Sequence, residues 1–374
     1  MQNTGFIEKQ PLITDFQVGA ESGIAPEVLA EDGQYDLYLP DEETQSRNLF
    51  DALDCVTFSA LNNIETILTY KISKGLIPPE KIQWLKNNGY IDPSTNKVNF
   101  SDRFTAKMSG TTRNGNSLGA VGDSIRLHTN GSGDGLVPES AWPWPKEMTD
   151  AMTYDEKWNL YYAEIPESVK AIGKKFLEIF DIKYEWVAIG TFITTPAEQI
   201  KNALKYGPVQ IAAPICPPWG SNEGDTEIKA CGDTRPAHAT EIYGFIDGEA
   251  WKDFDHYKSF RKRLDWNYCI PYAFRYSIVA KVPPVVPAPI VHTFATNLSL
   301  GSRGPEVEYL QKALKQLGFF ALGYTTQYYG DYTRKAVLAF QLAEKVDTAE
   351  ELAKLNGEYF GPRSRAIMNA LLKK

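Results

Sequence analysis

Cysteine and histidine are scarce in this chain, which narrows the search for nucleophilic chemistry. Its 374 residues include four histidines and four cysteines, Cys55, Cys216, Cys231 and Cys269. The sequence contains neither a CxxC pair nor a Cys/His spacing typical of zinc, so we expect no metal and no cofactor. Cys216 and Cys231 either form a disulfide in an oxidising setting or remain two thiols.

Cys55 is the candidate nucleophile, because it follows Asp54 at the predicted start of a long helix. Unpaired N–H groups and the helix dipole at such a position stabilise a thiolate and lower the pKa of the thiol. The polar residues just upstream predict that the sulfur is accessible. A small buried core cysteine is the alternative, and position alone does not decide between the two.

A histidine and an acid lie on a predicted hairpin. The segments His238–Ile246 and Glu249–Asp255 have the pattern of two strands joined by a two-residue type I′ turn. In that register Asp255 opposes Thr240, one diagonal step from His238 and within reach of a hydrogen bond. A carboxylate there fixes the orientation and tautomer of an imidazole base. A structural strand histidine and an edge charge are the alternatives.

The spacing of apolar residues predicts the helices and strands that position Cys55, His238 and Asp255. Apolar residues near the 3.6-residue period predict a helix over about Cys55–Lys71. A helix followed later by strands favours an α+β fold over a doubly wound parallel sheet. The predicted strands are Trp186–Ile193, Pro208–Ala213, His238–Ile246, Ala250–Tyr257 and Phe274–Val282.

A proline-rich segment divides the chain. Pro283, Pro284, Pro287 and Pro289 favour extended polyproline II, which predicts a semi-rigid linker over residues 281–294. The expected organisation is an N-terminal extension, a large domain, the linker and a small helical domain, over residues 1–34, 35–280, 281–294 and 295–374.

The order of these features resembles papain-like cysteine peptidases over roughly residues 35–280. The stretch Asp54–Ala60 resembles the nucleophile helix of that family, and Gly115-Asn116-Ser117 with Asp134–Pro143 resembles its glycine-containing subsite and the stretch after it. Gly207-Pro208-Val209 and His238–Phe245 resemble later landmarks. The resemblance implies an α+β fold, with a helical subdomain and an antiparallel β subdomain.

Site roles follow from the same resemblance. It implies that Cys55 is the nucleophile, His238 the base and Asp255 the orienting residue, where the family usually has Asn. Val56 replaces the Trp that usually follows the nucleophile, and His256-Tyr257 replaces the usual Ser-Trp. These departures motivate a second hypothesis, that the peptidase fold has decayed and is not catalytic.

The resemblance also implies contacts with substrate. Gly115, Asn116 and Ser117 are the expected substrate-binding residues. Leu49 stands nearest the usual position of the oxyanion glutamine, so Gln45 serves that role only if the loop before Cys55 carries an insertion. The stretch before Cys55 is shorter than the family's inhibitory pro-segment, so autoactivation is not expected.

The C-terminal part has a helical pattern with an internal repeat. Apolar spacing predicts one helix after Gly304-Pro305, a second from Asp331 as N-cap to about Val346, and a third from Pro362 onward. The segments Tyr329–Val337 and Phe360–Met368 echo each other. With the stretch after Leu300 they resemble the peptidoglycan-binding domain of wall hydrolases, which implies a three-helix module that holds the protein on cell wall. A generic helical bundle or docking module is the alternative.

Composition excludes several classes of function. The net charge of −8 and the pI of about 5.3 exclude a nucleic-acid footprint spread over the whole chain. No apolar run is long enough to predict a transmembrane helix. The first residues lack the features of a signal peptide. We expect cytoplasmic synthesis and a cell-wall, extracellular or virion location reached by another route.

These observations predict a cysteine endopeptidase that uses a Cys-His-Asp triad and is tethered to bacterial cell wall. Its substrate is a protein at the envelope or, as in endolysins, the stem peptides of peptidoglycan. The alternative from another class is a non-catalytic wall-binding structural or phage virion protein. A thiol-dependent transpeptidase shares the chemistry but needs an amine acceptor.

Overall fold

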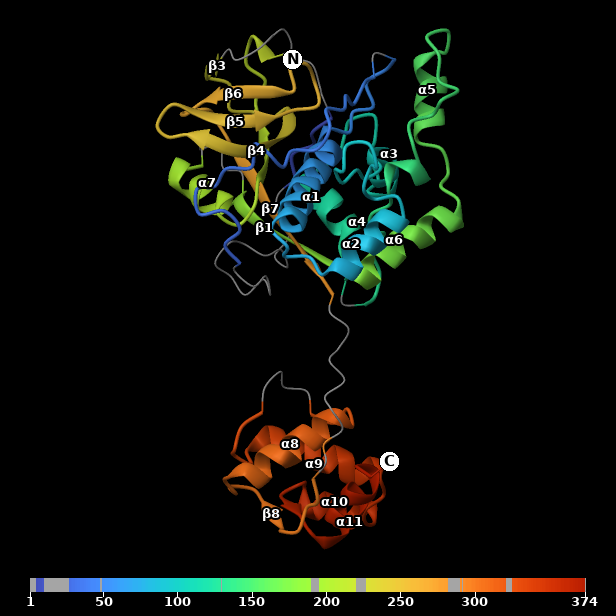
Figure 1. Ribbon diagram of the computed structural model, residues 1–374, viewed down its shortest axis with the longest axis vertical. Coiled ribbons are helices and arrows are strands. Elements are labelled where there is room, and N and C mark those ends of the chain that lie inside the picture. The colour runs from blue at the N-terminus through green and yellow to red at the C-terminus, as the bar shows by residue number, and fades with distance from the viewer. Residues whose placement is uncertain are drawn as a thin grey trace. The chain divides into compact units, whose positions relative to one another are not determined.

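The computed structural model describes residues 5–9, 27–47, 49–128, 130–189, 195–219, 227–281, 290, 292–320 and 325–373. The chain forms two compact units, Met1–Lys281 and Val282–Lys374, and each has a hydrophobic core of its own (Figure 1). Most of the predicted linker, and residues 10–26 of the predicted N-terminal extension, lie outside the described residues.

A mainly antiparallel sheet organises the large unit. Its seven strands, counted among the described residues, follow the order β1-β7-β2-β4-β5-β6-β3, and within it the β3–β6 pair is parallel. This topology confirms the α+β class. The strands are Phe180–Ile189 (β1), Val209–Ala213 (β2), Glu227–Ile228 (β3), His238–Ile246 (β4), Ala250–Phe254 (β5), Arg261–Asp265 (β6) and Tyr272–Ala280 (β7).

Helix α1, Cys55–Ser73, packs against both the sheet and neighbouring helices (Figure 1). It is buried over nearly its whole length, which explains why its sequence is apolar on most sides. Gln210 of β2 donates hydrogen bonds to the carbonyl of Val56 and to Ser59 Oγ, both at 2.8 Å. The other helices of this unit are Pro79–Asn87 (α2), Asp102–Met108 (α3), Leu118–Ile125 (α4), Glu139–Ala141 (η1, a 3-10 turn), Tyr154–Tyr161 (α5), Glu167–Ile179 (α6) and Ala197–Leu204 (α7).

The hairpin of β4 and β5 differs from the predicted one near its turn. Three residues, Asp247–Glu249, form the loop, and Ile246 pairs with Ala250 rather than with Glu249. The N–H of Glu249 donates to the carbonyl of Ile246, and the φ of 70° at Gly248 suits the third residue of a type II turn. An irregularity between Ile242 and Gly244 then moves the pairing by one residue, so the far end of the hairpin has the predicted register.

Other strand predictions were partly wrong. β1 begins at Phe180, before the predicted Trp186, and residues 190–193 of that prediction lie outside the described residues. β6, Arg261–Asp265, was not predicted, because three of its five residues are charged bases. β3 was also missed.

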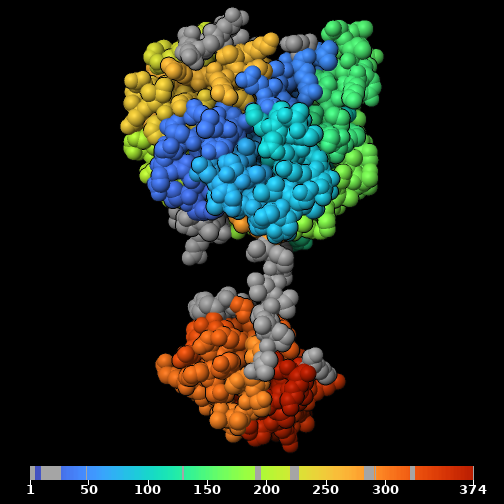
Figure 2. Space-filling model, in the orientation of Figure 1, coloured from blue at the N-terminus to red at the C-terminus, as the bar shows by residue number. Residues whose placement is uncertain are grey.

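Residues 27–47 pack along the large unit, although 27–34 were predicted to be an extension. Leu29 N–H donates to the carbonyl of Lys205, and Tyr35 N–H donates to the carbonyl of Tyr243 in β4. These residues belong to the dark blue region on the face of the large unit shown in Figure 2. This stretch is therefore part of the large unit.

The C-terminal unit contains the three predicted helices, together with a short fourth helix and a two-stranded ribbon. Gly330 rather than Asp331 is the residue before the second helix, and Asp331 instead pairs with Arg334 and Lys335 in the first turn. The elements are Leu298–Ser299 (β8), Pro305–Gln316 (α8), Asp331–Ala343 (α9), Ala349–Leu355 (α10), Tyr359–Phe360 (β9) and Pro362–Leu371 (α11).

The internal repeat of this unit is visible in its hydrogen bonds. Gln311 Nε2 donates to the carbonyl of Tyr328 and to Thr333 Oγ1. Gln341 Nε2 makes the equivalent pair of bonds, to the carbonyl of Tyr359 and to Ser364 Oγ. Gln311 thus ties α8 to the first turn of α9, and Gln341 ties α9 to the first turn of α11. Within the described ranges, no helix of either unit has the length and apolar character needed to cross a membrane.

Candidate active site

Cys55 is the first residue of α1, and its side chain lies in the interior of the large unit with an exposed fraction of 0%. Burial raises the pKa of the Cys55 thiol well above its ordinary value, and the carboxyl groups of Asp54 and Asp51 add to this. A hydrogen bond from the backbone N–H of Ala239 to the sulfur acts in the opposite direction. The predicted accessible, acidic thiol is therefore wrong for this structure, because desolvation outweighs the benefit of the helix start.

Asp54 does not make the sulfur accessible either. Its side chain is buried and accepts a hydrogen bond from Tyr161 Oη at 2.7 Å. Burial raises the pKa of Asp54 to about 8, so this carboxyl group is mostly protonated at neutral pH.

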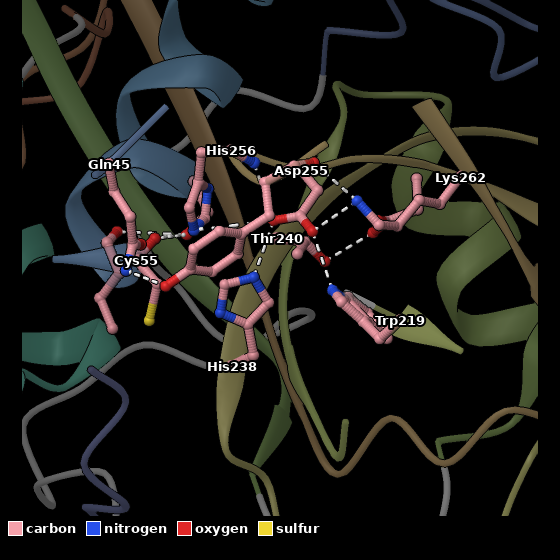
Figure 3. Close-up of polar contacts among 12 residues, drawn as sticks. Gln45, Cys55, Trp219, His238, Thr240, Asp255, His256 and Lys262 are labelled. Carbon is pink, nitrogen blue, oxygen red and sulfur yellow. Dashed lines mark hydrogen bonds and ion pairs between the residues drawn. The ribbon is translucent and has the colours of Figure 1, made fainter. Parts of the chain in front are cut away.

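His238 and Asp255 form a buried pair at the end of the hairpin away from its turn (Figure 3). The distance from His238 Nε2 to Asp255 Oδ1 is 2.7 Å, and both side chains have an exposed fraction of 0%. His238 begins β4, and the N–H of the next residue, Ala239, contacts the Cys55 sulfur. The structure thus brings together the predicted nucleophile, base and acid.

Asp255 is held by four donors. Its Oδ1 accepts from His238 Nε2 and from the backbone N–H of His256, and its Oδ2 accepts from Trp219 Nε1 at 2.8 Å. Lys262 Nζ lies 2.7 Å from the same Oδ2. Burial alone would raise the pKa of Asp255, but the charges of His238 and Lys262 outweigh it and hold the pKa well below its usual range.

His256 lies beside this cluster as a neutral ring. Burial lowers the pKa of His256 to about 3. Its ring nitrogens have no hydrogen-bond partner within the described part of the chain, and its ring centroid lies 4.7 Å from that of His238 and 5.3 Å from that of Phe58. Ligand-type atoms of His238, Asp255 and His256 lie within 4.8 Å of one another, a grouping that could hold a metal ion. Lys262 already neutralises Asp255 there, which disfavours added positive charge.

Gln45 lies close to Cys55 although ten residues separate them in sequence (Figure 3). The intervening loop folds back, since the N–H of Ala52 donates to the carbonyl of Gln45. The Gln45 amide nitrogen donates to Asp51 Oδ1 and to Tyr257 Oη, both at 2.5 Å. The oxyanion role of Gln45 stays a prediction, and in this structure its amide is engaged by these other groups.

The predicted substrate-binding segment, residues 115–117, is bound to the chain's own N-terminal residues 5–9. The carbonyl of Asn116 accepts from Ile7 N–H at 2.7 Å, and the N–H of Asn116 donates to the carbonyl of Gly5 at 2.8 Å. Gly115 has a φ of 97°, and a Cβ there would lie 1.9 Å from that same carbonyl oxygen. Ser117 instead caps α4 through a hydrogen bond from Ala120 N–H. Gly115 and Asn116 thus receive an extended backbone.

Residues 5–9 also reach the backbone just before Cys55. Gly5 lies directly against Leu53, since a Cβ on Gly5 would lie 2.2 Å from the Leu53 carbonyl oxygen. Phe6 is buried beside Tyr272, and Glu8 accepts a hydrogen bond from the Tyr272 hydroxyl at 2.6 Å. The N-terminal stretch, for which no inhibitory role was expected, thus contacts both the candidate subsite and the loop that carries the nucleophile.

Three side chains in the site were not predicted from sequence: Trp219, Tyr257 and Lys262. Tyr257 Oη donates to Asp51 Oδ2 at 2.6 Å and so links the segment after β5 to the loop before α1. Residues two apart on a strand face the same side, so the apolar Leu264 indicated that Lys262 is buried as well. For Trp219 we find no comparable signal.

Cys216 and Cys231 form a disulfide, with their Cα atoms 5.5 Å apart, which resolves the alternative left open by sequence. Trp219 lies within the loop that this bond closes, and Cys216 N–H donates to the Tyr268 hydroxyl. The disulfide therefore anchors the loop that carries a donor to Asp255.

Comparisons with known proteins bear on the two units separately. Residues 303–347, which include α8 and α9, match the family model described as "Putative peptidoglycan binding domain". This match supports an association of the chain with cell wall. No curated protein matched the chain in the sequence comparison.

The solved structures that are similar to this chain include proteases. Digestive procathepsin L2 proteinase from Tenebrio molitor larval midgut is 15% identical, with a TM-score of 0.44, over 75% of this chain and 78% of that one. Bromelain protease from Ananas comosus is 14% identical, with a TM-score of 0.40, over 64% of this chain and 94% of that one. The ragweed cysteine protease Amb a 11 in its proform is 13% identical, with a TM-score of 0.37, over 64% and 62%. Values of this size establish no activity for this chain.

Proposed function

We propose that the chain is a cysteine peptidase whose C-terminal unit holds it on bacterial cell wall. The observation that carries the proposal is the buried His238–Asp255 pair, 2.7 Å apart, beside the Ala239 N–H that contacts the Cys55 sulfur. A base oriented by an acid next to a thiol is the arrangement that nucleophilic catalysis requires. The peptidoglycan-binding match of residues 303–347 supports the wall location.

The chemistry uses these residues in two steps. His238 takes the thiol proton while the Cys55 sulfur attacks an amide carbonyl, and the same proton then passes to the leaving amine. The resulting thioester is hydrolysed by a water molecule, whose proton His238 accepts and returns to the sulfur. Asp255 holds the imidazole through its Nε2 side, so that the other ring nitrogen serves the sulfur.

The oxyanion formed in both steps needs donors. The backbone N–H of Cys55, at the unpaired start of α1, is one donor. The Gln45 amide is the second, after it releases Asp51 or Tyr257.

Substrate binding requires residues 5–9 to leave. Their main-chain hydrogen bonds with Asn116 support a site that receives an extended peptide backbone at Gly115 and Asn116. Their departure also exposes the backbone beside Leu53 and opens a route to Cys55. The substrate is a peptide amide at the envelope, either in a protein or in a peptidoglycan stem.

A second function has an observation in its favour. The complete burial of Cys55, with its raised pKa, fits a closed, non-catalytic wall-binding protein. In that case residues 5–9 are a permanent part of the core.

Wall fragments and a fluorogenic peptide, each incubated with the purified chain, separate these functions. We expect new amines from one substrate or both, and a loss of about a thousandfold or more in Cys55→Ala. Cys269→Ala is the matched control, because Cys269, like Cys55, lies outside the disulfide, and this variant should retain activity within about twofold. Hydrolysis that survives in Cys55→Ala refutes Cys55 as the nucleophile, and hydrolysis that is absent from the unaltered chain favours the non-catalytic protein.

A further inference from the structure

Lys262 is a buried lysine whose ammonium group is fully used. It lies on β6 with its side chain at an exposed fraction of 0%. Its Nζ contacts Asp255 Oδ2 at 2.7 Å, donates to the carbonyl of Tyr257 at 2.8 Å and donates to the carbonyl of Ser259. Three acceptors match the three protons of an ammonium group. Lysine is almost never fully buried unless it is paired, so this contact is specific.

The pair formed by Lys262 and Asp255 has no net charge. His238 therefore faces one oxygen of a neutral pair instead of an isolated buried carboxylate. An isolated carboxylate in the interior would strongly favour the charged imidazolium, whereas a cation on its other oxygen reduces that preference. The hydrogen bond that orients the imidazole is kept in both cases.

Other titratable groups near His238 leave this pair as the main local charge. Burial lowers the pKa of His256 and raises the pKa of Asp253, Tyr257 and Cys55, which favours the neutral form of each near pH 7. Asp54, with a pKa of about 8, is mostly neutral as well. The Asp51 carboxylate lies beyond Tyr257, where it accepts hydrogen bonds from that hydroxyl and from Gln45.

We propose that Lys262 is a positioning residue that sets the protonation of His238 by neutralising Asp255, so that the base can both accept and release a proton near neutral pH. This inference rests on the proposed peptidase function. It assigns a role to a residue that touches neither substrate nor sulfur and acts only through Asp255.

The test is the pH dependence of kcat/KM for a small peptide in the full chain. The acid limb of that profile reports protonation of the His238 imidazole, because the proposed mechanism starts from a neutral base and a neutral thiol. Lys262→Met leaves the carboxylate uncompensated, so we expect the limb to move up by about one pH unit or more. Asp255→Asn leaves the ammonium uncompensated, so the limb should move down by a similar amount. The double variant Asp255→Asn/Lys262→Met contains neither charge and should return the limb to within about 0.3 units.

Arg263→Met is the matched control, because it removes the same charge from the same strand but from an exposed position. It should leave the limb in place. Shifts of the two single variants in the same direction, or no shifts in variants that fold, would show that Lys262 acts only by packing. If one of the single variants fails to fold, the double variant tests the proposal in its place. The proposal is then overturned if the double variant also fails to fold, or if its limb is displaced from that of the unaltered chain.

The result is separable from the proposed function. A chain that hydrolyses no peptide refutes the peptidase, whereas an active chain without opposite shifts refutes only the role of Lys262. NMR titration of the His238 ring in the same variants measures the opposite shifts without any need for turnover. Their absence in that titration overturns the inference as well.

Discussion

At the residue scale, burial decides which groups of the site carry charge. Cys55, Asp54 and His256 are all buried, and for each of them desolvation is the largest influence and favours the neutral form. Asp255 is equally buried but is held as a carboxylate by His238 and Lys262. Charge in this interior therefore exists where a partner has been provided for it.

Glu241 of β4 gives a prediction at this scale. Its side chain is buried with an exposed fraction of 0%, and burial raises the pKa of Glu241 to about 8. Between about pH 5 and 8 the folded chain keeps a proton that the unfolded chain has lost, so stability falls as the pH rises through this window. We expect Glu241→Gln to have little effect near pH 5 and to stabilise by up to roughly 1 kcal/mol per pH unit toward pH 8.

Thermal unfolding of both chains at pH 5 and at pH 8 measures this difference. Glu249→Gln, in the exposed turn of the same hairpin, is the control and should behave alike at the two pH values. An equal change in stability at pH 5 and pH 8 for Glu241→Gln would argue against a buried neutral carboxyl group.

At the element scale, the segment of residues 5–9 covers the candidate site. In the proposed mechanism the site is closed while this segment is bound and open after it leaves. Phe6 provides most of its buried apolar surface, whereas its main-chain bonds to Asn116 would be replaced by bonds to water on release. The affinity of this segment for the site therefore depends mainly on one side chain.

Phe6→Ala is expected to open the site. Loss of the buried ring removes about 2–3 kcal/mol of stabilisation from the bound segment. Since 1.4 kcal/mol corresponds to a tenfold change in an equilibrium, labelling of Cys55 by iodoacetamide should become at least about tenfold faster. Leu37→Ala is the control, because Leu37 is 85% exposed. An unchanged labelling rate in Phe6→Ala would mean that other parts of the chain bury the sulfur.

Elements with a strong periodic pattern could be predicted from sequence. The predicted starts of α1 at Cys55 and of β4 at His238 agree with the structure, because long apolar runs define them. The hairpin register was wrong at the turn and right at Glu241, which pairs with Phe254, because the longer loop and the irregularity near Tyr243 compensate for each other. Neither deviation has a signal that periodicity alone could detect.

Burial at the site could not be predicted in the same way. Lys262, the partner of Asp255, lies on β6, which was not predicted as a strand because its sequence is mostly charged. Only the two-residue spacing of Lys262 and Leu264 indicated that the lysine side chain faces the interior. The burial of Cys55 depends on contacts from residues far away in sequence, among them Gly5 near Leu53. The position of Cys55 at a helix N-terminus predicts a lowered pKa for the thiol. Burial by tertiary contacts, which the local sequence does not show, raises that pKa instead.

At the scale of the whole molecule, the two units have separate cores. The core that contains Val307, Leu314 and Phe340 in the C-terminal unit shares no residue with the cores of the large unit. A separate core is the feature expected of a unit that can fold on its own. A wall-binding unit then contributes local concentration rather than chemistry.

Deletion of residues 282–374 should separate these contributions. We expect kcat/KM for a soluble peptide to change by less than about twofold, because the proposed catalytic groups all lie in Met1–Lys281. Release of amines from wall fragments should fall by about a hundredfold at low enzyme concentration, because a tether converts the second encounter into an intramolecular one. The C-terminal unit added as a separate chain should not restore this release, since it binds wall without carrying the peptidase there. If the truncated chain digests wall fragments as fast as the full chain, the tether has no role in catalysis and the wall-binding unit must serve localisation alone.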